Sequence, residues 1–511
     1  MMYGEEKSDS LIVAANLANN PQGAESVERR SGAKGNAEQP HMRRTQSRES
    51  MSQRLSRVRE AAKQRKKERF TALFHLLTAE ALENAFLSLS RKAAAGVDGV
   101  RWKDYAENLK VNIAELHRRL HQGSYRAQPG RRHYIPKADG KQRPLGIASL
   151  EDKIVQYALV KILNAVYEND FMGFSYGFRP GRSQHNALDA LATGLVRTNV
   201  NWVLDADISQ FFDKVSHEWL IRFIEHRIGD QRVIRLIRKW LTAGTSEEGE
   251  WRASEEGEWR ASEEGEWRAS EEGTPQGAVI SPLLANIYLH YVFDLWAHQW
   301  RRRHATGNVV MVRYADDIVI GFDKRIDAQC FRIAMQRRLK EFGLTVHPKK
   351  TRLTEFGRFA AENRASRGKG KPETFNFLGF THISGKDRSG RFMLIRKTRR
   401  DRMTATLKAI KDGLRKRWHY SIPEQGKWLR RVVQGYLNYH SVPGNYPMMR
   451  KFRIYVTDLW RRALRRRSQQ DDTTWTKANR LAAVWLPKVR VLHPWPVERF
   501  TARHPRQEPG A

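Results

Sequence analysis

The chain has 511 residues, with 92 Lys or Arg against 56 Asp or Glu, which gives a formal net charge of +36. So large a positive charge favours a polyanionic partner, with nucleic acid ahead of an anionic membrane surface, and the length allows about three domains. The one cysteine, Cys330, excludes an intramolecular disulfide and a cysteine-based zinc cluster.

The N-terminal part of the chain is polar. Residues 1–65 are poor in aromatics and rich in Ser, Gln, Gly and Arg, which predicts a disordered basic segment. The region includes acids that a transit peptide would avoid, and the longest apolar stretch, residues 277–293, is interrupted by polar residues. We therefore expect a soluble intracellular protein without a membrane span, whose ordered part begins near residue 65.

The first predicted hairpin covers residues 133–147. A turn at 138–141 separates two short strands, and Lys137 and Arg143 flank it on opposite strands. Exposed basic residues in a hairpin are commonly solubilising. A pair that grips a triphosphate is the alternative.

A strand predicted over residues 201–208 follows a helix predicted over 151–166. It ends in Asp205-Ala206-Asp207-Ile208, and Phe211-Phe212-Asp213 opens the next segment. Side chains alternate along a strand, so Asp205 and Asp207 share one face and either is a candidate metal ligand.

An octapeptide, Ser-Glu-Glu-Gly-Glu-Trp-Arg-Ala, occurs three times over residues 246–269, and a truncated fourth copy covers 270–273. Three copies of so short a unit are too few for a solenoid. We interpret the repeat as a tandem duplication within one surface loop, and consider an acidic flap over a basic channel the weaker reading.

A second hairpin is predicted over residues 309–322, with Asp316 and Asp317 at its tip. Adjacent aspartates repel each other, and a divalent cation would remove that repulsion; a solvated turn is the alternative for the tetrapeptide alone. Chain extension of a nucleic acid needs two Mg²⁺ about 4 Å apart, held by carboxylates from two adjacent strands. Asp207 and Asp316 meet this need if their strands pair.

Downstream, we predict a helix over residues 328–342, a Lys349-Lys350 pair and a buried strand over 375–380. Residues 396–467 contain 21 Lys or Arg against 4 Asp or Glu. A helical apolar stripe runs from Trp428 to Leu437 and leaves basic residues exposed to phosphates.

The ordered set of motifs resembles the reverse transcriptases encoded by group II introns. The palm-type motifs are Asp207-Ile208 with Phe212-Asp213, and Tyr314-Ala315-Asp316-Asp317. The set is completed by residues 136–137, 143–146, 176–180, 276–277, 281–282 and 377–380. Together they are specific, whereas each alone is weak.

The resemblance implies a role for each matching residue. Catalysis and metal binding fall to Asp207, Asp316 and Asp317, with the Ile208 carbonyl as a further ligand of two Mg²⁺. For dNTP binding the matching residues are Lys137, Arg143, Phe212, Gln276 and Gly277, Phe212 being the gate against ribose. Lys350 is a candidate general acid. Ala278 departs from the usual glycine.

The resemblance also implies an α+β right-hand polymerase. Residues 66–385 would form fingers and palm, interrupted by the insertion 246–273, residues 386–470 a helical thumb or maturase domain, and residues 471–511 a basic DNA-binding-like tail. No endonuclease module is expected. The partners would be template RNA, the parent intron RNA, a DNA primer or target and dNTPs, in a bacterial cytoplasm or nucleoid.

Two other functions compete with a polymerase that is also a maturase. One is an RNA-binding splicing cofactor with an inactive polymerase, and the presence of all three acids argues against it. The other is a viral-type RNA-dependent RNA polymerase, which Phe212 and the Tyr-Ala before the acids disfavour.

Overall fold

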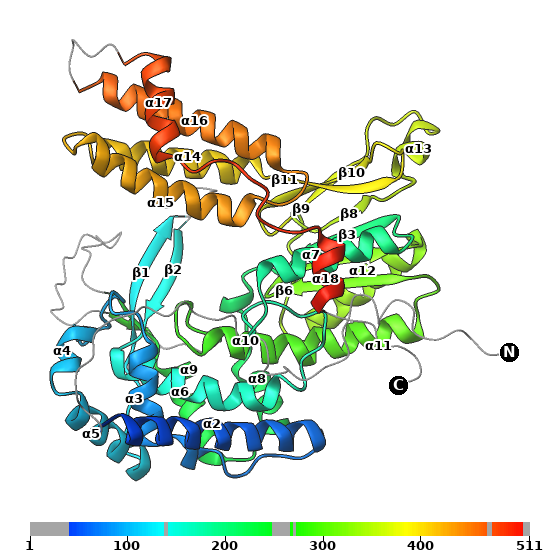
Figure 1. Ribbon diagram of the computed structural model, residues 1–511. Coiled ribbons are helices and arrows are strands. Elements are labelled where there is room, and N and C mark those ends of the chain that lie inside the picture. The colour runs from blue at the N-terminus through cyan, green and yellow to red at the C-terminus, as the bar shows by residue number, and fades with distance from the viewer. Residues whose placement is uncertain (1–39, 137–141, 248–265, 269–271, 468–472, 504–511) are drawn as a thin grey trace, which may run out of the picture.

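The computed structural model describes residues 40–136, 142–247, 266–268, 272–467 and 473–503, a mixed α/β structure (Figure 1). Lys137 and most of the octapeptide insertion lie outside these residues. Within them, no helix combines the length and the apolar character that crossing a bilayer requires.

The helices form most of the molecule. Two short 3-10 turns are η1 (Phe74–Leu76) and η2 (Phe211–Asp213), and a π-helical turn, η3 (His290–Asp294), joins α10 to α11. In chain order the helices are α2 (Pro40–Gln64), α3 (Ala79–Ser88), α4 (Trp102–Glu107), α5 (Leu109–Gln122), α6 (Leu150–Tyr167), α7 (Gln184–Arg197), α8 (His217–Arg227), α9 (Gln231–Thr242), α10 (Ser281–Leu289), α11 (Leu295–Arg303), α12 (Arg325–Glu341), α13 (Ala360–Ala365), α14 (Arg400–Arg415), α15 (Ile422–His440), α16 (Tyr446–Arg465), α17 (Trp475–Trp485) and α18 (Pro496–Arg503).

The strands form three sheets, ordered β2-β1-β4-β5, β6-β7-β3-β8 and β11-β10-β9. Their bounds are β1 (Gly130–Pro136), β2 (Gln142–Ile147), β3 (Trp202–Asp207), β4 (Thr245–Glu247), β5 (Glu266–Arg268), β6 (Val309–Tyr314), β7 (Asp317–Phe322), β8 (Arg352–Glu355), β9 (Thr374–Phe377), β10 (Phe380–Lys386) and β11 (Phe392–Thr398). Both predicted hairpins, β1–β2 and β6–β7, are confirmed as antiparallel pairs.

The β6-β7-β3-β8 sheet is covered on both faces. Val310 and Val312 pack with residues of α7 in one apolar cluster, whereas Val309 and Met311 belong to a larger cluster with residues of α10, α11 and α12. This explains why β6 is apolar from Val309 to Val312 and β7 from Ile318 to Ile320, since alternating side chains of a buried sheet enter two different cores. Because both faces are packed, the sheet holds the residues at its strand ends in fixed positions.

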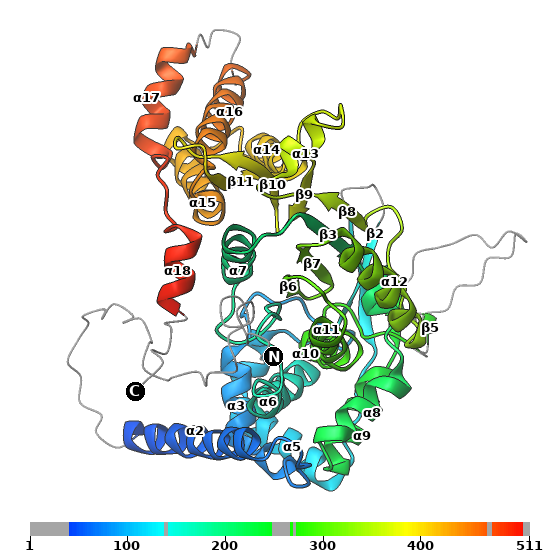
Figure 2. The same ribbon diagram turned by 90° about the vertical axis from the view of Figure 1, so that its right-hand side faces the viewer.

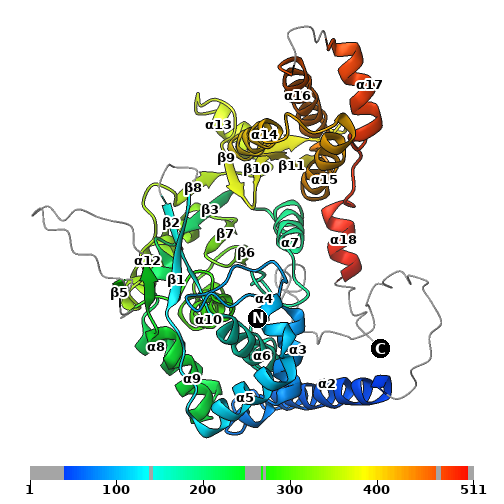
Figure 3. The same ribbon diagram turned by 90° about the vertical axis from the view of Figure 1, so that its left-hand side faces the viewer.

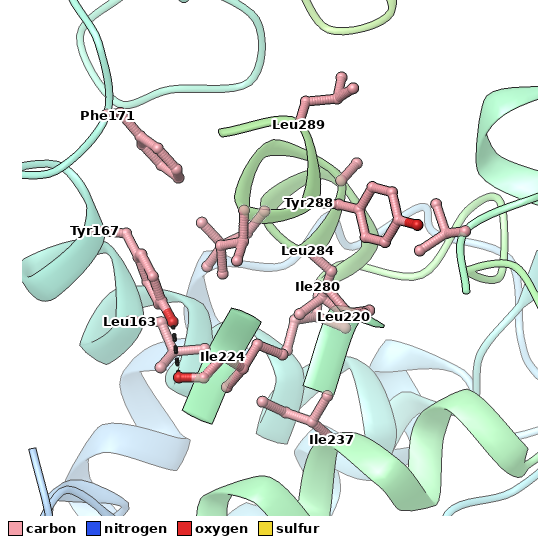
Figure 4. Packing of buried hydrophobic residues seen from close by; sticks show 14 of the residues in the cluster. Leu163, Tyr167, Phe171, Leu220, Ile224, Ile237, Ile280, Leu284, Tyr288 and Leu289 are labelled. Atoms are coloured by element: carbon pink, nitrogen blue, oxygen red, sulfur yellow. Dashed lines mark hydrogen bonds between the residues drawn. The ribbon is translucent and has the colours of Figure 1, made fainter. Parts of the chain in front are cut away.

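The larger cluster continues away from the sheet, where helices pack on one another (Figure 4). Ile224 of α8 packs there with Leu163 of α6 and Leu284 of α10. The Tyr167 hydroxyl donates to the Ile224 carbonyl oxygen at 3.3 Å, so the one polar group of that ring is satisfied. This cluster joins the N-terminal helices to the sheet.

The basic helical region stands apart from the β6-β7-β3-β8 sheet, with the β9–β11 sheet between them (Figure 1). α14, α15, α16 and α17 share an apolar cluster of their own. As predicted from the stripe, Leu429, Val433 and Leu437 of α15 are buried while Arg430 and Arg431 are exposed.

Two sequence predictions are corrected here. The single strand predicted over residues 375–380 is a hairpin instead, because Leu378 (φ 44°) and Gly379 (φ 80°) reverse the chain between β9 and β10. Residues 40–64, predicted to be disordered, form α2, which packs on α6. Met51, Leu55, Val58 and Ala62 recur at helical spacing and join the larger cluster.

The C-terminal segment returns to the sheet. α18 lies beside α7 in both rotated views (Figures 2 and 3). Arg499 of α18 donates from Nη2 to Asp189 Oδ1 of α7 at 3.0 Å, and its Nε also bonds that carboxylate. Asp189 is 2% exposed, so a buried ion pair fixes α18 on α7.

Candidate active site

Two of the predicted acids are direct neighbours. Asp207, the last residue of β3, is the cross-strand partner of Asp317, the first residue of β7. The backbone of Asp207 bonds on its other side, where its carbonyl accepts from His347 N at 2.7 Å. Asp207 and Asp317 therefore form the closely spaced, non-hydrogen-bonded type of antiparallel pair, with both side chains on one face.

Asp316 stands at the turn between β6 and β7. Tyr314 pairs with Asp317, so the loop consists of Ala315 and Asp316 alone. Ala315 has φ 55°, the left-handed conformation that such two-residue turns require. The turn brings Asp316 next to the Asp207–Asp317 pair.

A buried arginine holds this turn from below. Arg313 is 0% exposed, and its Nη1 donates to the Ala315 carbonyl at 3.0 Å and to Asn286 Oδ1 at 3.1 Å. Its charge is balanced by Asp294 of the π-helical turn, which accepts from Nε at 2.7 Å. A charge buried in this way requires full pairing, so the network fixes the turn conformation.

Gly177 packs against the same turn. Asn286 Nδ2 donates to the Gly177 carbonyl at 2.7 Å, and a Cβ on Gly177 would lie 2.3 Å from Ala315 N. Sequence reasoning assigned no role to Arg313, Asn286 or Asp294. The available signal was the single arginine in the otherwise apolar strand Val309–Tyr314, since an unpaired charge is not tolerated inside a buried sheet.

The acids perturb one another electrostatically. Lost hydration, followed by repulsion from Asp316 and Asp207, raises the pKa of Asp317 to about 7, although part of its side chain is open to solvent. Burial, followed by repulsion from Asp317 and Asp207, likewise raises the pKa of Asp205 to about 7. The carboxylates of the site thus repel one another, and a bound cation would reduce this repulsion.

A lysine already contacts the acids. Lys350 Nζ donates to Asp207 Oδ2 at 2.9 Å. Within the described parts of the chain, no three His, Cys, Asp or Glu side chains converge as a ready-made metal site. The carboxylate oxygens of Asp207, Asp316 and Asp317 are the ligand type that Mg²⁺ takes, but their side chains would have to turn toward a common ion and away from Lys350.

The Ile208 carbonyl points away from the segment around Val346 that lies beside it. Ile208 faces Val346 in an isolated antiparallel bridge, whose hydrogen bonds are made by Ser209 N to Thr345 O and by His347 N to Asp207 O. In such a pair the backbone groups of Ile208 itself point to the opposite side.

A pocket of about 250 Å³ adjoins η2. Phe212, Pro144 of β2 and Gln276 line it, and Gln276 Nε2 donates to Asp213 Oδ1 at 3.0 Å. The Gln276 carbonyl accepts from Gly146 N at 2.7 Å, which joins the loop after the insertion to β2. Three segments far apart in sequence thus meet around one cavity.

Of the remaining predicted nucleotide contacts, the structure describes Gly277 in full and the backbone of Arg143. Gly277 has φ 110°, and a Cβ there would be 3.0 Å from Gly146 O, which explains the glycine. Arg143 lies in β2 opposite Ile135, but its side chain is outside the described part of the structure, as is all of Lys137. Ala278 is 7% exposed and is not among the residues with positive φ, so its Cβ fits the loop.

The chain is similar in sequence to known proteins. Residues 135–382 match the family model described as reverse transcriptase (RNA-dependent DNA polymerase). Protein YkfC of Escherichia coli K12 is 39% identical over 222 residues, which are 42% of this chain and 54% of YkfC. The group II intron-encoded protein LtrA of Lactococcus lactis is 35% identical over 239 residues, 46% of this chain and 37% of LtrA.

A shorter match, of 91 residues at 32% identity, is to nuclear intron maturase 2 of Arabidopsis thaliana and covers 18% of this chain and 12% of that protein. The chain spans about half or less of the length of these relatives.

Proposed function

Because this chain is a relative of the group II intron-encoded reverse transcriptases and maturases, we propose that it is an RNA-directed DNA polymerase that also binds its parent intron RNA to assist splicing. The main observation that supports polymerase activity is the direct cross-strand pairing of Asp207 with Asp317, beside Asp316. The substrates are a primer 3′-hydroxyl, a template strand and a dNTP.

In this proposal Asp207, Asp316, Asp317 and the Ile208 carbonyl hold two Mg²⁺. When bound, the ions supply charge stabilisation for the attacking 3′-hydroxyl and the leaving pyrophosphate. The protein contributes position: Arg313 and Gly177 fix the backbone of the turn, so that only the carboxylate side chains would have to turn toward the ions.

Lys350 has two roles in the proposal. Its ammonium pairs with Asp207 before the ions bind, at 2.9 Å, and neutralises part of the acidic cluster. With the ions bound, Lys350 would be the general acid that gives a proton to the departing pyrophosphate.

The incoming nucleotide would occupy the pocket lined by Phe212 and Gln276. Phe212 would exclude a ribose 2′-hydroxyl by contact, Gln276 and Gly277 would support the nascent base pair, and Lys137 and Arg143 would bind the triphosphate. The bond between Gln276 and Asp213 supports this arrangement, because it holds the amide at the pocket wall.

By the same proposal, residues 66–385 with β1–β8 correspond to fingers and palm, and residues 386–470 with α14–α16 to the thumb or maturase domain. The exposed cations of these helices, such as Lys427 and Arg431, would contact RNA phosphates.

Primer extension on poly(rA) with an oligo(dT) primer tests the proposal. Asp316→Ala should lose most of the rate, by about 100-fold or more, while RNA binding is retained. Glu341→Ala, which removes an exposed acid at the end of α12, is the matched control and should extend normally. If the wild type binds intron RNA but does not extend the primer, the alternative function, a splicing cofactor with an inactive polymerase, would be favoured. Normal extension by Asp316→Ala would show that the assignment of the catalytic acids is wrong.

A further inference from the structure

A second cavity lies far from the acids, between the C-terminal ends of α14 and α16. It has a volume of about 120 Å³, and we call it the α14–α16 slot. Its floor is made by Leu414, Trp418, Leu459 and Ala463. Leu414 is 1% exposed, so the floor of the slot belongs to the apolar core of these helices and the slot is more than a shallow surface depression.

The rim of the slot is entirely basic. Lys411, Arg415, Arg462 and Arg466 surround the apolar floor. Arg462 pairs with Asp458 at 2.7 Å, whereas no carboxylate of the described residues pairs with Lys411, Arg415 or Arg466. All four cations are exposed, so three of them are available to a ligand.

The size and chemistry of the slot limit what it can bind. At about 120 Å³ it is smaller than the pockets of roughly 300–1,000 Å³ that hold cofactors and drug-sized ligands. An apolar floor that includes the indole of Trp418 suits one flat ring system. Three cations without a carboxylate partner around it suit the phosphates on either side of that ring. A nucleotide in a strand combines these features.

We propose that the α14–α16 slot binds a single unstacked base of an RNA strand, with the adjacent phosphates on Arg415 and Arg466. The inference rests on the proposed function, since it takes RNA to be the partner of the helical region. It adds a defined site where that function gives only a basic surface.

The position of the slot separates it from the polymerase chemistry. α14 begins directly after Arg399, whose charge acts on Asp205 at the sheet. Its 16 residues extend about 24 Å, and the slot lies at the far end of the helix, in the group of helices that stands apart from the sheet in Figure 1. The bound base is therefore not the one being copied. A bulged or loop nucleotide of a structured RNA fits this place.

Binding of two RNA hairpins to the full chain tests the proposal. One hairpin is fully paired and the other carries a single bulged nucleotide. Wild-type protein should prefer the bulged hairpin by roughly 5- to 150-fold, the range expected for stacking of one base. Ala463→Leu, which fills the slot and leaves every charge in place, should remove this preference.

The cations are tested separately. Arg415→Gln with Arg466→Gln should weaken binding of the bulged hairpin and lower its salt dependence by about two charges. Lys408→Gln with Arg465→Gln, on the same helices but outside the slot, makes the same change in net charge and should keep the preference for the bulge.

Wild-type protein also gives a result that needs no variant. A photoreactive 4-thiouridine at the bulge should crosslink within residues 411–418 or 459–466. Crosslinking elsewhere, or an unchanged preference in Ala463→Leu, would overturn the slot. Primer extension on a short template should be as fast in all these variants as in the wild type, because the slot lies away from the acids. If the wild type itself does not extend a primer, the proposed polymerase is wrong, and the binding tests of the slot still stand.

Discussion

Gly177 and Ala315 approach so closely that a Cβ on Gly177 would stand 2.3 Å from Ala315 N. Since Ala315 and Asp316 form the whole hairpin loop, Gly177→Ala must push the carboxylates away from Asp207. We expect primer extension to fall by about 100-fold, as displacements near 1 Å do at catalytic groups. The control is Gly370→Ala, where a Cβ meets nothing within 4 Å.

The Gly177→Ala protein should remain folded by circular dichroism and should still bind RNA, because the glycine lies beside the turn and not in the helical region. Full activity in this variant would mean that the turn can move without harm, and the positioning role of Arg313 and Gly177 would then be wrong.

Phe212 should control sugar selection. Its ring is half-buried in the wall of the 250 Å³ pocket, and Phe212→Val would open space where a ribose 2′-hydroxyl could fit. We expect the ratio of rNTP to dNTP incorporation to rise by about tenfold or more while dNTP extension continues. Phe359→Val, at an exposed ring elsewhere, should leave the ratio unchanged.

The site could be predicted from the sequence where chemistry and periodicity agree. The Asp316-Asp317 tip lies between two apolar runs, and the observed β6–β7 hairpin has the predicted limits. Alternation could not choose between Asp205 and Asp207, since both share a face, and their proximity to Asp317 depends on a pairing of strands about 110 residues apart. That pairing is a tertiary property that no local pattern carries.

The unpredicted parts are those in which a local rule is overridden. Arg313 sits in a strand that should have no charge, and Leu378 takes a left-handed conformation in what reads as continuous strand. Each is stabilised by distant partners, Arg313 by Asp294 and the β9–β10 turn by Tyr439, whose hydroxyl donates to Leu378 O at 2.8 Å. Sequence alone does not reveal such partners.

The octapeptide insertion should be dispensable for catalysis. β4 and β5 pair Glu247 with Glu266, and deletion of residues 248–263 would leave Glu264 and Gly265 to join them, a length and a glycine that suit a two-residue hairpin. The 16 residues removed are an even number, so the strand faces are preserved. Extension rates should stay within about twofold of the wild type; loss of activity would assign the repeat a functional role.

The C-terminal segment should be needed for stability. Arg499→Gln leaves Asp189 buried with Arg396 as its remaining cation, at 3.7 Å. We expect a loss of about 3 kcal/mol in the free energy of unfolding, measured in urea, and faster proteolysis near α18. Arg490→Gln, an exposed arginine in the same segment, should change neither. An unchanged stability in Arg499→Gln would contradict the anchoring role and leave the DNA-binding-like tail that the resemblance implies.

Buried histidines should make the protein sensitive to acid. His382 is 0% exposed, stacks on Phe375 at 4.7 Å and lies opposite Arg396 in the β10–β11 pair. Burial, reinforced by Arg396, lowers the pKa of His382 to about 3, against 6.5 in the unfolded chain. Between these pH values the unfolded state binds a proton that the folded state does not bind. The contribution of His382 to stability is therefore fully present above pH 6.5 and is lost as the pH decreases toward 3.

In His382→Phe, which keeps the stacked ring without a titrating group, the melting temperature should depend less steeply on pH between 6.5 and 4.5 than in the wild type. His304→Phe, at an exposed histidine, should keep the wild-type slope, and equal slopes in all three proteins would show that His382 titrates normally in the folded state.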